Sequence, residues 1–320
     1  MLIHEDPEQD LVVLPAEFDP EPGTPFELER AILRTVAYAD VFDYPLTAEE
    51  IHRYLIGVRA ARPEVEACLD GGGLSAGRLS RRDEYYTLPG REQLAALRRE
   101  RGAVAARLWP KAVRYGRAIA RLPYVRMAAV TGALAVDNVA AGADLDYLVV
   151  TAPGRLWCCR AMVILLVRWA ALHGDTICPN YFLSEAALVY RGPGLYAAHE
   201  MAQMVPLAGM GVYRRMIRLN PWVGDYLPNV VLPPRWLAQP DELNLRSRSR
   251  GAAETLLGTS LGDRLESWEM ARKIEKFNRL EGASSEAGFC ADWCKGHFDG
   301  HERRTMAAYA ARLRQHEAGR

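Results

Sequence analysis

Apolar residues in the first third of the chain recur at helical spacing, and helix-stopping residues separate the apolar segments. Over residues 26–39 the apolar positions fall three to four residues apart, which predicts an amphipathic helix. Thr47 and Glu50 form a capping-box pattern that predicts a helix over residues 48–55. Pro63 suits the first turn of a third helix, which ends before a run of glycines.

The next segment alternates in a way that suits a hairpin. Residues 79–88 predict a strand, a turn and a second strand, with arginines in the turn region. Three short helices followed by a hairpin is the layout of a winged helix. The third helix, over residues 63–70, is acidic and therefore a poor reader of a DNA groove. The pattern favours a structural or protein-contact role over DNA binding.

The middle of the chain predicts a small mixed sheet. Short apolar runs at residues 127–130 and 148–150 read as strands, and a helix is expected over residues 155–173. Residues 177–183 predict a third strand, and Pro179 indicates that it begins irregularly or lies at an edge of the sheet.

Long helices are expected on both sides of this sheet. The basic segment 91–122 favours helix and contains Pro110, so we expect two helices there. After residue 188 the pattern predicts helices within 192–207 and 212–222, then a loop, then helices over 251–280 and 305–316.

The sequence therefore predicts an α+β fold with a helical C-terminal region. We expect five parts in chain order: an acidic flexible arm (1–25), a winged-helix-like domain (26–90), a basic helical connector (91–126), a mixed-sheet palm (127–190) and a helical C-terminal domain (191–320).

Two carboxylates mark the candidate chemistry of the sheet. Asp144 and Asp146 open the second strand, and the alternation of a strand would point both toward the same face. Such a pair is repulsive unless a cation lies between the two groups, and Mg²⁺ is commonly held by one or two carboxylates plus substrate phosphates. Gly132, before a short helix-capable segment, would let a phosphate approach backbone N–H groups.

This arrangement resembles the nucleotidyltransferase superfamily of polymerase-beta type, over residues 125–190. The family has a Gly-Ser pair, then Asp-x-Asp about a dozen residues later and an apolar strand. Gly132, Asp144 and Asp146 match this pattern, whereas Ala133 stands where the family has serine, which removes one hydroxyl contact to the triphosphate. The wider layout, FDYPLT early and NYFLSE after the palm, is similar to an uncharacterised bacterial group of such proteins.

The resemblance implies a palm fold, Mg²⁺ or Mn²⁺ at the two aspartates and an NTP substrate, with ATP as the expected nucleotide. It also implies a third carboxylate on the strand after the palm helix. Asn180 occupies that strand, as a further candidate nucleotide contact, so the third carboxylate has to come from elsewhere. Glu185 after the strand and Glu200 on a predicted helix are the candidates, with His199 beside Glu200 as a possible substrate contact.

A cluster near the C-terminus leaves alternatives open. Cys290, Cys294, His297 and His301 are residue types that bind zinc, but the link between the two pairs is too short for an ordinary structural site, and we expect no zinc. Lys295 and His297 could instead reach nucleotide phosphates. The third possibility is an apolar core with a solvated surface.

Charge is balanced overall but unevenly distributed. Residues 1–30 hold nine acidic residues and one arginine, a net charge of −8, whereas residues 78–126 hold thirteen basic and four acidic residues, a net charge of +9. The basic segment could contact nucleic acid or another polyanion weakly, or could simply be a solvated helix surface. The acidic arm could mask it.

The N-terminus has neither a basic nor an apolar signal region, and no apolar run is long enough for a bilayer, so we expect a cytoplasmic protein with reduced cysteines and no membrane contact. The leading hypothesis is metal-dependent transfer of a nucleoside monophosphate from an NTP to a small molecule, a protein or an RNA end. The alternative is a non-catalytic, nucleotide-responsive module that binds nucleic acid or a partner protein.

Overall fold

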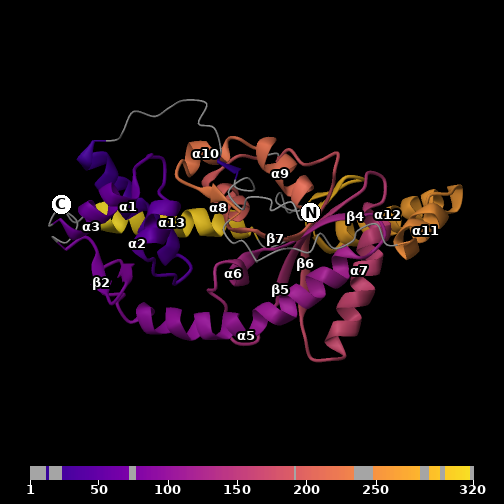
Figure 1. The fold of residues 1–320 in the computed structure, drawn as a ribbon, viewed down its shortest axis with the longest axis horizontal. Coiled ribbons are helices and arrows are strands. Elements are labelled where there is room, and N and C mark those ends of the chain that lie inside the picture. The colour runs from indigo at the N-terminus through magenta and orange to yellow at the C-terminus, as the bar shows by residue number, and fades with distance from the viewer. Residues whose placement is uncertain are drawn as a thin grey trace, which may run out of the picture.

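A six-stranded mixed sheet lies at the centre of the protein, and helices cover both of its faces (Figure 1). The strand order is β7-β4-β5-β6-β10-β9; β5 and β6 are parallel, and all other neighbours are antiparallel. The computed structural model describes residues 12–13, 24–71, 77–190, 192–233, 248–281, 288–295 and 300–317. The strands of the sheet are β4 (Val125–Val130), β5 (Leu145–Thr151), β6 (Ile177–Ser184), β7 (Val205–Ala208), β9 (Gly288–Phe289) and β10 (Trp293–Lys295).

Helices make up most of the remaining described chain. They are α1 (Pro25–Asp40), α2 (Ala48–Arg53), α3 (Arg62–Asp70), α5 (Leu94–Ala120), α6 (Gly132–Ala135), α7 (Leu156–Ala171), α8 (Leu195–Gln203), α9 (Met210–Arg218), α10 (Val223–Tyr226), α11 (Arg248–Leu257), α12 (Ser260–Glu281) and α13 (His301–Glu317). Two small antiparallel pairs complete the structure: β1 (Val12–Val13) with β8 (Val231–Leu232), and β2 (Ser80–Arg82) with β3 (Tyr85–Thr87). The predicted mixed fold, mixed sheet and helical C-terminal region are confirmed.

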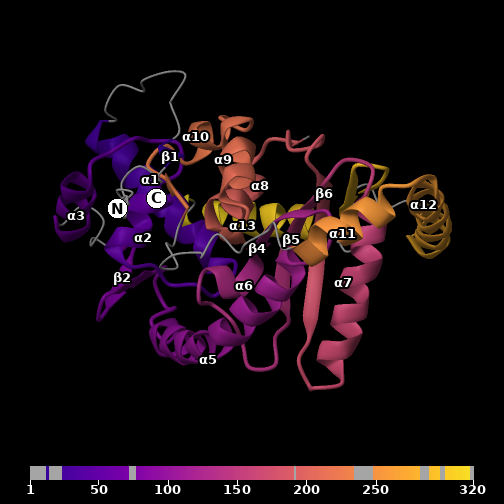
Figure 2. The same cartoon turned by 45° about the vertical axis from the view of Figure 1, so that its right-hand side comes forward.

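The alternation of side chains along β5 separates two hydrophobic clusters. Tyr147 and Val149 point toward a cluster formed with buried residues of α5 and α7. Leu148 and Val150 belong to the other cluster, together with residues of α8 and α9. Figure 2 shows α5 and α7 on one side of the sheet and α8 and α9 on the other. Asp146 shares the β5 alternation of Leu148, so it lies on the side covered by α8.

The N-terminal helices begin where local capping chemistry places them. The predicted capping box at Thr47 and Glu50 is confirmed: the Glu50 backbone N–H donates to Thr47 Oγ1 over 3.2 Å, and the Thr47 N–H donates to Glu50 Oε2 over 2.9 Å. A second capping box, between Thr24 and Glu27, starts α1. Each satisfies two backbone N–H groups that a helix start otherwise leaves unpaired.

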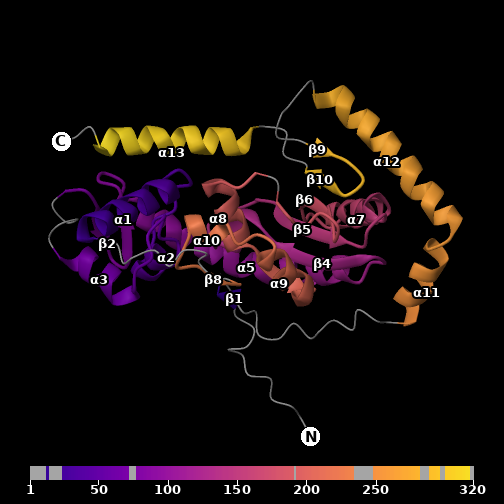
Figure 3. The same ribbon diagram turned by 90° about the horizontal axis from the view of Figure 1, so that it is seen from above.

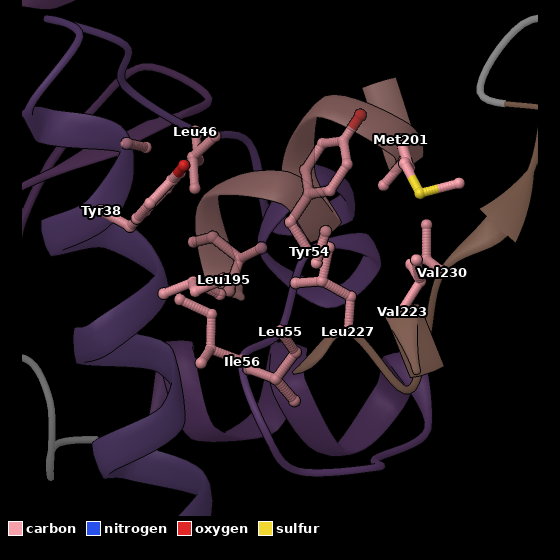
Figure 4. Packing of buried hydrophobic residues seen from close by; sticks show 14 of the residues in the cluster. Tyr38, Leu46, Tyr54, Leu55, Ile56, Leu195, Met201, Val223, Leu227 and Val230 are labelled. Carbon is pink, nitrogen blue, oxygen red and sulfur yellow. The ribbon is translucent and has the colours of Figure 1, made fainter. Parts of the chain in front are cut away.

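These N-terminal helices share one core with the segment that follows the sheet. Tyr38, Tyr54 and Leu55 lie in the same buried cluster as Leu195 of α8 and Leu227 after α10 (Figure 4). The N-terminal helices therefore do not pack as an isolated unit, because a large part of their apolar surface is covered by residues far along the chain.

Helix α13 joins the N-terminal helices to the sheet region (Figure 3). The Tyr309 ring meets Tyr38 edge-on, with ring centroids 5.5 Å apart. Arg312 Nε donates to Asp40 Oδ2 over 2.5 Å, and Arg91 Nε donates to Asp40 Oδ1 over 3.0 Å. Asp40 is almost fully buried, so these two guanidinium groups compensate its charge.

Arg312→Met is expected to lower the free energy of unfolding by about 1.5–3 kcal/mol, the range for a hydrogen bond to a charged group. Methionine retains the apolar stem but leaves Asp40 with one arginine fewer. Arg304→Met, an exposed position on the same helix, is the control and should change stability by less than about 0.5 kcal/mol. Urea titrations compare the two; equal effects would show that the Arg312–Asp40 contact contributes nothing.

Several predicted elements differ from the structure. The segment 91–122 forms one helix, α5, with Pro110 inside it, rather than two. Pro110 is exposed, as is Ala106 four residues earlier, so water can satisfy the carbonyl that the proline leaves without a donor. The predicted helix 251–280 is instead two helices, α11 and α12, which meet at Gly258.

The sheet is also larger than predicted. Residues 205–208, expected at the end of a helix, form edge strand β7 against β4. Strand β6, for which Pro179 suggested an irregular start or an edge position, lies between β5 and β10. Its irregularity is confirmed, because the β5–β6 register shifts between Asp146 and Leu148, opposite Pro179 and Asn180. No described helix has the length and apolar character needed to cross a bilayer.

Candidate functional site

The candidate site is built around a close approach between Gly132 and Asp146. Gly132 begins α6 with φ +67°, a conformation that favours glycine. A Cβ at this position would lie 2.5 Å from Asp146 Oδ2 and 3.2 Å from its Cγ. The Thr131 N–H donates to the Asp146 carbonyl over 3.1 Å, which fixes the two segments against each other. Glycine is therefore required for both conformation and space.

Asp146 is held in a defined orientation by the strand beside it. Asn180 Nδ2 donates to Asp146 Oδ1 over 2.7 Å, and Cys178 Sγ donates to Asn180 Oδ1 over 2.7 Å. The register shift in β6 brings Asn180 to this position. The chain Cys178–Asn180–Asp146 thus orients one carboxylate oxygen and leaves Oδ2 beside Gly132, the kind of support that metal-binding carboxylates have in proteins.

The pKa of Asp146 is raised to about 6, chiefly by burial and also by the nearby Asp144 carboxylate, while the hydrogen bond from Asn180 opposes the shift. Asp144 is exposed and lies just before β5 rather than within it. The predicted repulsion within the pair is therefore present, with Asp146 as the desolvated member. A bound cation would stabilise the ionised form of both groups.

Ala133 follows Gly132 in α6, and its carbonyl accepts from the Asn138 N–H over 2.9 Å. It supplies no side-chain hydroxyl. Helix α6 has four residues, so any contact to an anion here would come from individual N–H groups rather than from a long helix dipole.

A cavity of about 480 Å³ lies beside this pair, on the α8 side of the sheet. Thr131 and Asn180, which both bond Asp146, form part of its wall. The volume is within the range of small-molecule sites in proteins. Its remaining walls come from the loop after β6, from α8, from the β9–β10 turn and from the first turn of α13.

The two candidate third carboxylates lie in different places. Glu200, on α8, lines the cavity together with Asn180. Glu185 lies at the opposite end of the sheet: its N–H donates to the carbonyl of Thr151, the last residue of β5, and its carboxylate is 3.7 Å from Arg126 Nε. Because Asp146 is near the start of β5, the structure does not bring Glu185 to the aspartate pair.

His199 is turned away from the cavity. Its ring is fully buried and stacks on Tyr38 with centroids 3.9 Å apart, and its Nδ1 is 3.0 Å from the Leu195 carbonyl oxygen. His199 does not line the cavity, because adjacent positions on a helix point about 100° apart and Glu200 takes the cavity side.

Burial lowers the pKa of His199 from 6.5 to about 4, so the folded protein binds this proton less tightly than the unfolded chain. Stability is therefore expected to fall as pH drops from 6.5 toward 4, by about 3 kcal/mol in total. His199→Phe should flatten this part of a stability–pH curve, and His173→Phe, an exposed histidine at the end of α7, should not. Identical curves for both variants would contradict the assignment.

The predicted C-terminal cluster is only partly described. The Lys295 backbone pairs with Tyr181, one residue from Asn180, and β10 runs toward the end of the sheet that carries Asp146. The Lys295 side chain and His297 lie outside the described residues. Cys294 is buried in the core, and His301 lines the cavity. Within the described part of the chain, no group of three or more His, Cys, Asp or Glu residues is arranged to hold a metal ion.

Other residues at the site carry no local signal in the sequence. Cys178 could have been noticed only through its spacing of two from Asn180. Glu302 and Asp292 reach the cavity through long-range packing of α13 and of the β9–β10 turn. Comparisons with protein-family models, with curated proteins and with solved structures find no match to this chain.

Proposed function

We propose that this protein transfers a nucleoside monophosphate from an NTP to a small acceptor, with Asp144 and Asp146 as ligands of Mg²⁺. The single observation that carries the proposal is the Gly132–Asp146 contact, supported by Asn180 and next to a cavity of suitable size. Two carboxylates suffice for Mg²⁺ when substrate phosphates complete its coordination. The parts that support a palm of the polymerase-beta type are the β4–β5 hairpin, the parallel β5–α7–β6 unit and the aspartates at the start of β5.

The reaction needs in-line attack at the α-phosphorus. An acceptor oxygen forms a bond to this phosphorus, the bond to the β-phosphate oxygen breaks, and pyrophosphate leaves with that electron pair. Bound Mg²⁺ would neutralise charge on the phosphates. Asn180 holds Asp146 in place for this role, and Glu200, on the cavity wall, is the carboxylate we propose to accept the acceptor's proton.

For the N-terminal helices and the β2–β3 hairpin we propose a winged-helix-like arrangement with a structural role. Arg81, on the hairpin, donates to Asp70 of α3 over 3.4 Å, and Arg99 donates to Asp83 at the hairpin turn over 2.5 Å. These arginines are thus engaged within the protein, and the apolar surface of the helices is covered by the rest of the chain. Both observations favour a structural role for these helices, in which they pack against the elements around the cavity, over a role in DNA binding.

The direct test is incubation with each α-labelled NTP, Mg²⁺ or Mn²⁺, and a mixture of small cellular metabolites. Transfer is expected as label in a new small product together with released pyrophosphate. Glu200→Gln should slow transfer without weakening NTP binding, because it removes a proton acceptor and not a phosphate contact. The proposal is contradicted if the protein binds no Mg·NTP in equilibrium dialysis.

A further inference from the structure

The cavity beside Asp146 has an aromatic wall. Tyr181, Tyr190, Tyr196 and Trp293 all line it, from β6, the following loop, α8 and β10. Methionines of α8, α9 and the segment after α8 also line it. Such a wall offers ring faces and polarizable sulfur to a ligand with an apolar body.

Among the described residues of this wall, the charged side chains are mainly carboxylates. Glu200, Asp292 and Glu302 line the cavity, and among its described lining residues only His301 could supply a positive charge. Asp292 accepts a hydrogen bond of 2.6 Å from Ser184 Oγ. The Glu302 carboxylate comes within 3.6 Å of the position a Cβ would take on Gly194, at the start of α8. Two helices distant in sequence thus bring Glu200 and Glu302 to one cavity.

The two glutamates act on the same neighbours. Burial raises the pKa of Tyr196, and the negative charges of Glu200 and Glu302 raise it further. The same two carboxylates add to the raised pKa of Tyr38, behind the cavity wall. The described residues of this cavity therefore contribute a negative field, which disfavours a triphosphate and favours a cation.

The triphosphate and the ligand in the cavity are consequently expected to bind at two different places. A triphosphate requires a cation to approach Asp144 and Asp146, at the sheet end beside Gly132. The cavity, joined to this point through Thr131 and Asn180, has carboxylates and aromatic faces together, the combination that binds organic ammonium groups.

Resting on the function proposed above, we infer that the cavity binds the acceptor and that the acceptor is a small organic amine in its ammonium form, with an aromatic or aliphatic body. The ammonium group lies toward Glu302 and the body packs against the tyrosines, which leaves Glu200 to take the proton of the attacking group. The group that attacks phosphorus lies at the Asn180 end.

Three probes of one shape test the charge preference: phenethylamine, its neutral isostere 2-phenylethanol and the anion phenylacetate. Calorimetric titrations of the full chain, without nucleotide or metal, should show the amine binding about tenfold or more tightly than the alcohol. Glu302→Gln should reduce this preference about fivefold, since it removes one carboxylate of similar shape. Glu100→Gln, exposed on α5 and across the sheet, is the matched control and should leave the preference unchanged.

Equal binding of amine and alcohol, tighter binding of phenylacetate, or no amine binding at millimolar concentration each overturns the inference. Asp146→Asn should retain amine binding while losing Mg·NTP, which separates the two proposals. If the protein binds Mg·NTP but does not prefer the amine, the transferase proposal stands and the amine acceptor is rejected. If the protein prefers the amine but does not bind Mg·NTP, the amine site stands and the transferase proposal is rejected.

Discussion

Asp144→Asn and Asp146→Asn are each expected to abolish metal-dependent nucleotide transfer while the fold stays intact. Each substitution removes one negative charge from a pair that we propose as the protein's whole ligand set for Mg²⁺. Asp146 is the more stringent position, because Asn180 and Gly132 fix its carboxylate from two sides. Partners that orient a metal ligand in this way contribute to the affinity for the metal.

The apo protein should respond in the opposite direction. The pKa of Asp146 is raised from 3.8 to about 6, so its proton is bound more tightly in the folded state than in the unfolded chain. The associated stabilisation is full below pH 3.8 and is lost as pH rises through 6. At pH 8 and without metal, Asp146→Asn should therefore be more stable than the parent, by up to about 3 kcal/mol. The difference should disappear below pH 4.

Two measurements separate the effects. Thermal melts over pH 4–8 in chelator report apo stability, and equilibrium dialysis with Mg·NTP at pH 8 reports the site. Asp83→Asn, in the exposed β2–β3 turn, controls for the loss of an acidic residue and should retain nucleotide binding. If both site variants bind Mg·NTP like the parent, the nucleotide site lies elsewhere in the protein.

Local chemistry made much of the sheet and its acidic end predictable. Strands β4, β5 and β6 and the parallel unit around α7 follow from apolar runs between breakers, and the capping box at Thr47 and Glu50 fixes the start of α2. Gly132 and Asp146 were candidates from residue type and spacing alone. Their contact was not, because it depends on how the turn before α6 meets β5.

The remaining differences come from long-range packing. Residues 205–208 have the apolar character of a helix end but pair with β4, about 75 residues earlier in the chain, an arrangement that no local pattern specifies. Pro110 remains inside α5 because that face of the helix is solvated. Glu302 belongs to the cavity only because α13 packs on α1 and α8, and no spacing rule connects it to Asn180.

Among substitutions that add a single methyl group near the site, Gly132→Ala is expected to lower stability and nucleotide affinity the most. The positive φ costs about 1–2 kcal/mol for alanine, and the new Cβ would meet Asp146 Oδ2 at 2.5 Å. Neither partner can retreat easily, because Asn180 holds the carboxylate and the Thr131 N–H holds its backbone. Unfolding free energy should fall by about 2–4 kcal/mol, and Mg·NTP affinity by at least about tenfold.

Gly142→Ala is the matched control, since Gly142 has φ +79° and no atom within 4 Å of a new Cβ. Its unfolding free energy should fall only by the cost of the positive φ, about 1–2 kcal/mol, and it should bind Mg·NTP normally. A double-mutant cycle then isolates the contact: in an Asp146→Ala background, which removes the carboxylate, Gly132→Ala should cost no more than Gly142→Ala does. If Gly132→Ala costs the same in both backgrounds, the Gly132–Asp146 contact does not shape the site, and the geometric basis for placing a metal there is lost.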